Sequence, residues 1–230
     1  MSVVTIQPTT GDGYLYQRPS YNTICYGTDT VIYVNSEYAQ GENRNQRIVG
    51  KFDLSAIPSG AVISSAVLSL YAQAGSTAGR TLGCYRVIQT NWVEGTSPQT
   101  SNLSWDHYSG TTHWATGGGD YTATDKATAT SVLTNNWVDW QVAAQAQYAL
   151  GNVSGILHFL IKDETEGGAG VFSAFASREY STDTTKRPKL VITYTVPITT
   201  ASQIGSITRG NMKSRSGTLF GSVKNIDGLG

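Results

Sequence analysis

The sequence predicts an all-β protein, an antiparallel jelly-roll β-sandwich with one short crossover helix and a C-terminal extension. Segments in which apolar and polar residues alternate recur at short spacing along the chain. The turns between them are rich in Gly, Ser and Asn, and the chain has 25 glycines. Thr, Val and Tyr, which favour strands, recur throughout, with 13 tyrosines. These observations favour strands joined by polar loops over helices.

About nine segments have the length and pattern of strands. The clearest spans residues 47–54 (RIVGKFDL), where Ile48 and Phe52 lie on one face and Arg47 and Lys51 on the other. Residues 155–163 (GILHFLIKD) form a continuous apolar run, which is typical of a strand buried on both faces. The other strand candidates are residues 13–17, 29–35, 61–72, 83–92, 136–142, 171–179 and 189–196.

One helix is expected, over residues 142–151 (VAAQAQYALG), with Gly151 at the C′ position just past its end. Pro197 ends the last strand, and the composition then changes to a Gly- and Ser-rich stretch with Asp227 as its one acidic residue. We therefore predict a jelly-roll domain over residues 1–196 and a separate tail over residues 197–230.

The tail contains three short similar units, at residues 204–210, 212–217 and 223–228. A single unit cannot bury an apolar face by itself. The tail is therefore either disordered or a docking or oligomerisation segment that orders against a partner. The residues expected to make such assembly contacts are Ile204, Ile207, Met212, Lys213, Leu219, Phe220, Val223, Lys224 and Ile226.

Charge and hydropathy exclude several classes of partner. Lys+Arg and Asp+Glu both number 16, so the net charge is zero and gives no electrostatic case for nucleic acid or an anionic membrane. No apolar run approaches the roughly 18 residues of a membrane span. The N-terminus does not read as a secretory signal, so we expect synthesis in the cytoplasm, or a leader that has been lost. Cys25 and Cys84 either form a disulfide or stay as buried thiols, and thiols are favoured because nothing else indicates an oxidising compartment.

Residues 91–114 (NWVEGTSPQTSNLSWDHYSGTTHW) concentrate aromatic residues with few aliphatic ones to bury them. Three of the residues, Trp92, Glu94 and Trp105, are expected to be framework that folds this segment back onto a sheet. The rest suit contact with a sugar face or a protein, because aromatic rings there are flanked by hydrogen-bond acceptors. These candidate ligand contacts are Asp106, His107, Tyr108, His113 and Trp114.

The sequence shows no arrangement typical of a catalytic site. It has no Gly-x-Ser-x-Gly motif, and His158 falls within the buried run and is expected to be a core histidine. The loop at residues 162–170 offers Asp163, Glu164 and Glu166 as weak candidates for a structural Ca²⁺, although a solvated loop is the favoured interpretation. We therefore expect a protein that is not an enzyme and has no cofactor.

Several segments, in the right order over residues 10–196, resemble the DNRLRE domain family, a β-sandwich similar to carbohydrate-binding modules. They are DGYL (12–15), RIVGKFDLSAIPSGAVISSAVLSLYA (47–72), NWVEGT (91–96), LSWDHY (103–108), FASRE (175–179) and RPKLVITYT (187–195). Lys51 stands where the family usually has arginine, and Gln141 and Ala143 replace the residues that cap the helix. The resemblance implies a non-catalytic module without fixing its ligand. The tail, more weakly, is similar to short repeats near the ends of phage structural proteins.

Two hypotheses for function follow. The first is a virion protein, a capsid decoration or tail accessory protein, made in the host cytoplasm and anchored through residues 197–230 by self-association or by another virion protein. The alternative is an extracellular carbohydrate-binding module of a secreted enzyme or cell-surface protein. In both cases a surface polysaccharide is the candidate ligand.

Overall fold

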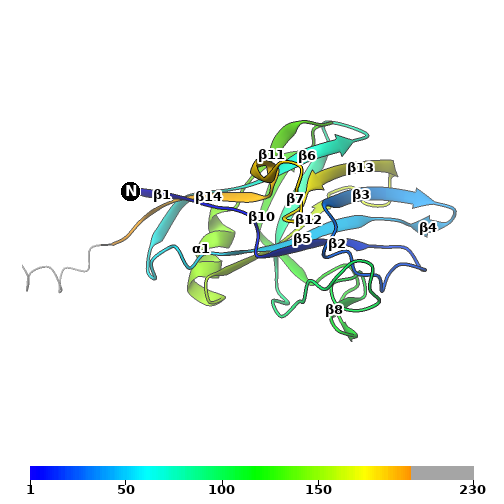
Figure 1. Cartoon of the computed structure of the whole chain (residues 1–230), viewed down its shortest axis with the longest axis horizontal. Coiled ribbons are helices and arrows are strands. Elements are labelled where there is room, and N and C mark those ends of the chain that lie inside the picture. The colour runs from blue at the N-terminus through cyan, green and yellow to red at the C-terminus, as the bar shows by residue number, and fades with distance from the viewer. Residues whose placement is uncertain (198–230) are drawn as a thin grey trace, which may run out of the picture. The chain divides into compact units, whose positions relative to one another are not determined.

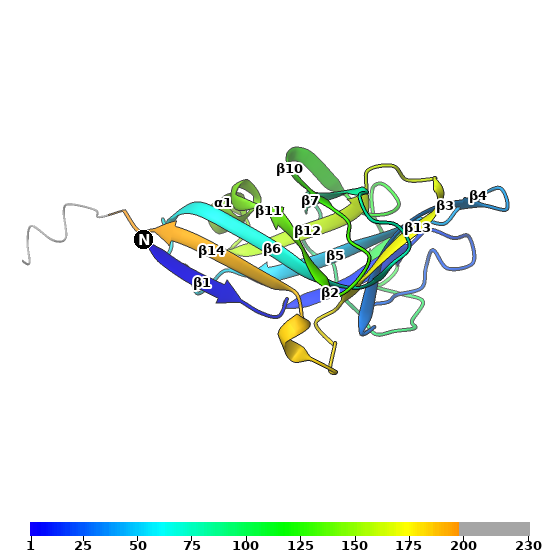
Figure 2. The same cartoon turned by 90° about the horizontal axis from the view of Figure 1, so that it is seen from above.

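The computed structural model describes residues 1–197, and the assembly residues expected in the tail lie outside them. Met1–Val196 form one compact unit. Its strands confirm the all-β antiparallel sandwich (Figures 1 and 2). The strands are β1 (Ser2–Ile6), β2 (Gly11–Tyr16), β3 (Val31–Ala39), β4 (Glu42–Asn43), β5 (Gln46–Asp53), β6 (Val62–Gly75), β7 (Thr81–Val87), β8 (His107–Ser109), β9 (Thr112–His113), β10 (Tyr121–Thr130), β11 (Asn136–Gln141), β12 (Ile156–Asp163), β13 (Ala169–Ala176) and β14 (Lys189–Thr195).

The strands form two layers. The first layer has the order β2-β5-β12-β7-β10, and the second contains β1-β14-β6-β13-β3, with β11 on the other edge of β6. A single residue pair, Asn35 with Gln46, links β3 to β5, so the hydrogen-bonded network is continuous around this edge. Figure 2 shows β1 beside β14 and β14 beside β6, as the pairing requires.

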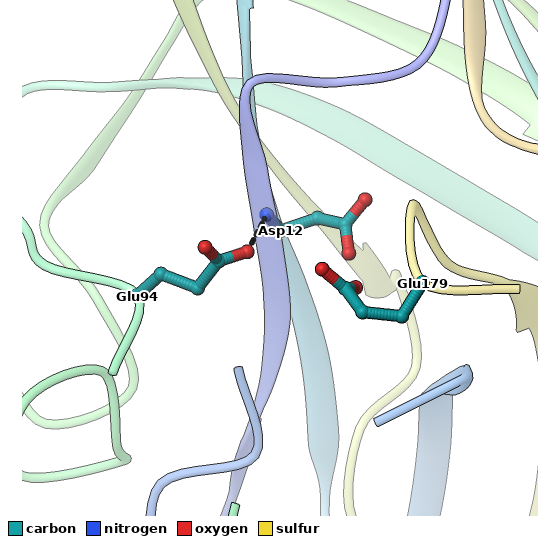
Figure 3. Close-up of side chains that lie close together, drawn as sticks. All are labelled: Asp12, Glu94 and Glu179. Atoms are coloured by element: carbon teal, nitrogen blue, oxygen red, sulfur yellow. Dashed lines mark hydrogen bonds between the residues drawn. The ribbon is translucent and has the colours of Figure 1, made fainter. Parts of the chain in front are cut away.

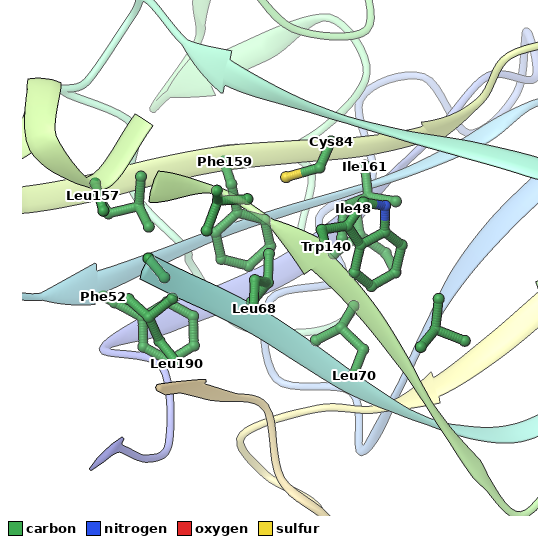
Figure 4. Close-up of a cluster of buried hydrophobic side chains, with 14 of the residues drawn as sticks. Ile48, Phe52, Leu68, Leu70, Cys84, Trp140, Leu157, Phe159, Ile161 and Leu190 are labelled. Atoms are coloured by element: carbon green, nitrogen blue, oxygen red, sulfur yellow. The ribbon is translucent and has the colours of Figure 1, made fainter. Parts of the chain in front are cut away.

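The main core lies between the layers. Ile48 and Phe52 of β5 and Phe159 of β12 face Leu68 of β6 and Trp140 of β11, and all five are fully buried (Figure 4). This is the arrangement that the alternating pattern predicts, because every second side chain of a strand points to the same face. Burying five such side chains contributes about 1.5–3 kcal/mol each relative to exposure.

Helix α1 (Ala143–Asn152) lies between β11 and β12, and its residues Ala146 and Ala149 are buried in the main core. It begins after Val142 without a side-chain cap, in line with the missing capping residues. The expected position of Gly151 was wrong, because Gly151 lies inside the helix. The left-handed residues that turn the chain are Ser154 (φ 50°) and Gly155 (φ 74°), and the Gly155 N–H donates to the Ala149 carbonyl. No helix among residues 1–197 is long and apolar enough to cross a membrane.

The strand predictions also need correction. The strand expected at residues 83–92 ends at Val87, so Trp92 belongs to the loop that follows. Strand β1, the short strands β4, β8 and β9, and strand β10 were not predicted. After Tyr121, β10 (YTATDKATAT) has no large apolar residue, and only the small Ala127 and Ala129 pack from it against the main core. Its sequence therefore has little of the hydrophobic alternation that identifies a strand.

Candidate functional site

A long loop covers the outer face of the first layer. We call residues 88–120 the lid; it includes the small hairpin β8–β9 and lies, in green, below β2 and β5 (Figure 1). The lid and the strands beneath it form a second hydrophobic core. Its buried members are Leu15, Cys25, Val49, Tyr85, Val87, Trp92, Leu103, Trp105, Trp114 and Leu160.

Trp92 is 2% exposed, and its indole N–H makes a buried hydrogen bond. Trp92 Nε1 donates to His158 Nδ1 at 2.9 Å, and the two rings meet edge to face. An imidazole that accepts on Nδ1 carries its proton on Nε2 when it is neutral. Burial, with a smaller effect of the Lys51 ammonium, lowers the pKa of His158 to about 4. His158 is therefore a neutral histidine that anchors the lid.

Trp105 is held by a buried arginine. The Arg47 guanidinium carbon lies 4.6 Å from the Trp105 ring centroid. Arg47 donates from Nε and Nη2 to the two oxygens of Glu166, both at 2.7 Å, and from Nη1 to the Gly118 carbonyl at 2.8 Å. Arg47 is therefore paired with Glu166, which also lies 3.6 Å from Lys162 Nζ, and the Arg47 side chain joins β5 to the lid.

Two of the five candidate contact residues are buried. Trp114 is 4% exposed and donates from Nε1 to the Ser104 carbonyl at 2.9 Å, so its ring packs inside the lid. His107 is 6% exposed, with its ring 4.5 Å from that of His113. Burial, followed by the proximity of His113, lowers the pKa of His107. In this structure neither Trp114 nor His107 presents a face to a ligand, which corrects the sequence-based choice of a sugar-stacking tryptophan.

The other three candidate residues are more accessible. His113 is exposed, whereas Asp106 and Tyr108 are half-buried. The ring of Tyr108 packs against Trp114 at 5.7 Å, on the side of the lid core. None of the five lines the pocket of about 690 Å³ that lies between the lid and the start of β10.

We call this pocket the lid pocket. Tyr121 and Ile88 supply apolar surface, and Gln89, Thr116 and Asp120 supply polar groups. The remaining lining residues are Arg47, Ala115, Gly117 and Gly119. Sequence reasoning missed this pocket because Arg47 and Tyr121 are far apart in the chain and neither stands in a recognisable motif.

A smaller, more polar hollow of about 330 Å³ adjoins the lid pocket, since Arg47 and Gly117 line both. Amide side chains dominate its wall, from Gln17, Asn43 and Asn45. The Asn45 amide is already bonded, because its Nδ2 donates to Gln17 Oε1 at 2.7 Å. The two hollows therefore offer apolar surface on one side and amide groups on the other.

Glu94 belongs to a compact group of carboxylates (Figure 3). An oxygen from each of Asp12, Glu94 and Glu179 lies within 4.8 Å of the others. Glu94 Oε1 accepts from the Asp12 backbone N–H at 2.8 Å, which ties the lid to β2. Arg178 Nε lies 3.3 Å from Glu94 and 2.5 Å from Glu179, so its guanidinium already supplies a positive charge to two of the three carboxylates.

Asp12 is fully buried and accepts from the Thr9 hydroxyl and the Arg178 backbone N–H. Burial raises the pKa of Asp12 to about 8, and repulsion from Glu179 and Glu94 adds to the increase. Burial also raises the pKa of Glu94. The cluster therefore holds a proton near neutral pH, which relieves the repulsion among its carboxylates.

The three candidate Ca²⁺ ligands are not brought together as a site. Asp163 pairs with Arg80 at 2.6 Å, and Glu166 pairs with Arg47. Glu164 accepts from the Tyr85 hydroxyl and pairs with Lys126 at 2.7 Å. Because each carboxylate is bound to a different cation of the protein, the loop does not offer the converging free oxygens that Ca²⁺ requires.

Residues 5–106 match carbohydrate-binding module family 96. The match runs from β1 through most of the lid, including Trp92, Glu94 and Trp105, and it supports a domain of the carbohydrate-binding-module type. It does not support the DNRLRE name or the resemblance of the tail to phage repeats. No curated protein matches the chain.

The burial of Trp114 gives a first prediction. Trp114→Ala should lower the free energy of unfolding by about 3–5 kcal/mol, because it removes a large buried ring and leaves a cavity. Thermal or urea unfolding of the purified chain measures this. His113→Ala, on the exposed neighbouring position, is the matched control and should change stability by less than about 0.5 kcal/mol. Equal, small effects of both changes would place Trp114 at the surface.

The carboxylate cluster gives a second prediction, on pH. Unfolded Asp12 ionises near its ordinary pKa of 3.8, whereas folded Asp12 stays protonated to about 8. The folded chain therefore binds more protons between these values, and this carboxyl makes the free energy of unfolding fall as pH rises, by up to about 1.4 kcal/mol per pH unit. His158 has the opposite effect below pH 6.5. Because its pKa is lowered in the folded protein, it makes the free energy of unfolding rise as pH rises.

The two contributions are separated by comparing the wild type with Asp12→Asn in urea unfolding between pH 5 and 8. The stability difference between the two proteins should change steadily in favour of the variant as pH rises, because only the wild type can lose the Asp12 proton. Parallel stability curves would mean that Asp12 ionises at its ordinary pKa in the folded protein.

Proposed function

We propose that the sandwich domain binds a polysaccharide at the lid pocket without cleaving it. The observation that supports this most is the composition of the pocket wall, where the ring of Tyr121 stands beside the polar side chains of Gln89, Thr116 and Asp120. Sugar recognition needs this combination, with an apolar surface for the ring face and polar groups for the hydroxyls. The family match over residues 5–106, which covers β2, β5, β7 and the first part of the lid, supports the same class of ligand.

The charges of the pocket favour a neutral sugar. Arg47 has five N–H donors, of which three are used by Glu166 and Gly118, so two remain for hydroxyl oxygens while its charge is balanced. Asp120 accepts from the backbone N–H groups of Ala115 and Thr116 and adds a negative charge. A uronate carboxylate would meet these carboxylates without a free cation to pair with, whereas hydroxyl groups find both donors and acceptors.

Isothermal titration of the full chain against neutral and uronate-containing polysaccharides tests this proposal. We expect binding to a neutral polysaccharide, and Tyr121→Ala should weaken it about tenfold or more, the equivalent of 1.4 kcal/mol of contact with the sugar. Tyr38→Ala is the matched control, because Tyr38 is 58% exposed on β3 and does not line the lid pocket.

The proposal fails if no polysaccharide binds, or if binding is equally strong in the wild type and in Tyr121→Ala. Thermal unfolding of both tyrosine variants shows whether the fold survives each change, because Tyr121 also packs against Tyr85 at 4.7 Å.

A finer proposal concerns where this domain is displayed. We propose that it belongs to a virion accessory protein anchored through residues 197–230, with an extracellular carbohydrate-binding module as the alternative. Support for the virion role comes from the sequence of that segment, whose short units suit docking, and residues 198–230 lie outside the described residues. A module that adheres to a surface glycan is compatible with both settings.

The assembly role has a direct test, in the molar mass by light scattering of residues 1–230 and of residues 1–196. If the tail is an assembly element, the full chain should form a trimer or larger oligomer and the truncated chain a folded monomer. Two monomers of equal stability would remove self-association through the tail, leaving a virion partner as the remaining form of the proposal.

A further inference from the structure

A second pocket, of about 480 Å³, lies at Lys51, four residues along β5 from Arg47. It is formed by Lys51 of β5, His158 of β12, Thr90 and Asn91 at the start of the lid, and Ser154 in the turn after α1. We call it the Lys51 pocket. The proposed polysaccharide site does not use it, because its lining residues differ from those of the lid pocket.

Lys51 enters this pocket as a cation without a carboxylate partner. Its Nζ lies 4.4 Å from the Trp92 ring centroid, and no Asp or Glu oxygen among residues 1–197 is within the 4.0 Å of an ion pair. Burial lowers the pKa of Lys51, while the charge of Glu94 acts in the opposite direction. A half-buried ammonium that is not paired is costly, and an anion that enters the pocket would offset this cost.

His158 supplies a second donor. Because its Nδ1 accepts from Trp92, the proton of the neutral ring is on Nε2, the nitrogen left for the pocket. With a pKa of about 4, the ring keeps this neutral form at physiological pH. The orientation is fixed by the same hydrogen bond that anchors the lid, so the donor is held in place before any ligand arrives.

The remaining polar groups also favour a ligand rich in acceptors. The side chains of Thr90, Asn91 and Ser154 make no hydrogen bond within residues 1–197, so their donors are free. The Thr10 hydroxyl, by contrast, already donates to the Lys51 carbonyl at 3.2 Å. No carboxylate lines the pocket, which distinguishes it from the lid pocket and its Asp120.

We propose that the Lys51 pocket binds a tetrahedral oxyanion, a sulfate or phosphate group, either as the free ion or as an ester on a glycan. Five groups with unused donors line it: an ammonium, an imidazole N–H, an amide and two hydroxyls. A tetrahedral oxyanion accepts at three or four oxygens and uses such a set more fully than a carboxylate, which has two.

The test is titration of the full chain with sodium sulfate and with inorganic phosphate at constant ionic strength, followed by calorimetry and by NMR of the His158 ring nitrogens. We expect saturable binding that shifts the Nε2 resonance of His158. Lys51→Met, which keeps an apolar stem over Trp92, should weaken binding at least tenfold.

Lys189→Met is the matched control. Lys189 also lies over a tryptophan, with Nζ 3.8 Å from the Trp137 ring centroid, but it lines none of the described pockets. Asn91→Asp is a second variant at an exposed position, and its added carboxylate should abolish anion binding without unfolding the chain. Thermal unfolding of each variant verifies the fold.

A sulfated polysaccharide and its desulfated form distinguish the two sources of the oxyanion. Binding of inorganic sulfate or phosphate that depends on Lys51 supports a free-ion site. Binding of the sulfated polysaccharide alone, lost in Lys51→Met, supports a site for the ester. The proposal is overturned if neither form binds, or if Lys51→Met and Lys189→Met reduce binding equally. Loss of neutral-glycan binding in Tyr121→Ala is a separate result, so the two proposals can fail independently.

Discussion

The constraint on which the rest of the structure depends is that β12 is apolar on both faces. Phe159 faces the main core, while the next residue, Leu160, points to the other side of the sheet and would be exposed there. A layer with one apolar and one polar face needs no cover, but this layer does. The lid supplies that cover with three tryptophans and Leu103, and the domain thereby acquires a second core instead of an adhesive outer surface.

Covering a sheet with a loop brings polar groups out of water, and each needs a partner. The indole N–H of Trp92 finds His158, and the Asp12 backbone N–H finds Glu94. Gly27 allows the lid to approach closely, because a Cβ there would lie 2.2 Å from the Glu94 carbonyl oxygen. These contacts fix the lid at several points. The lid pocket and the Lys51 pocket lie along the edges of the lid, where these fixed segments meet the strands.

The fold could be predicted from the sequence further than the site could. Alternation identified most strands, and the unbroken apolar run at residues 155–163 indicated burial on both faces before the covering segment was known. β10 was not predicted, because its alternating alanine and threonine residues differ little in hydrophobicity. In the lid, the sequence shows that aromatic residues are concentrated, but not which way each ring points. Trp92 and Trp114 are both buried in the structure. Of these two, Trp92 was expected to be framework and Trp114 was expected to contact a ligand.

The pockets could not be predicted from the sequence for a different reason. Their charge depends on which residues, far apart in the chain, pair with one another in the fold. Arg47 and Lys51 lie four positions apart on the same face of β5, and the sequence treats them as equivalent positive charges. In the fold, Arg47 pairs with Glu166, whereas Lys51 lies over Trp92 and has no carboxylate oxygen of residues 1–197 within 4.0 Å. One strand therefore gives a charge-compensated pocket at one end and an electropositive pocket at the other. A neutral sugar chain with a sulfate or phosphate substituent has the matching pair of chemistries, because its hydroxyls suit the first pocket and its anionic group the second.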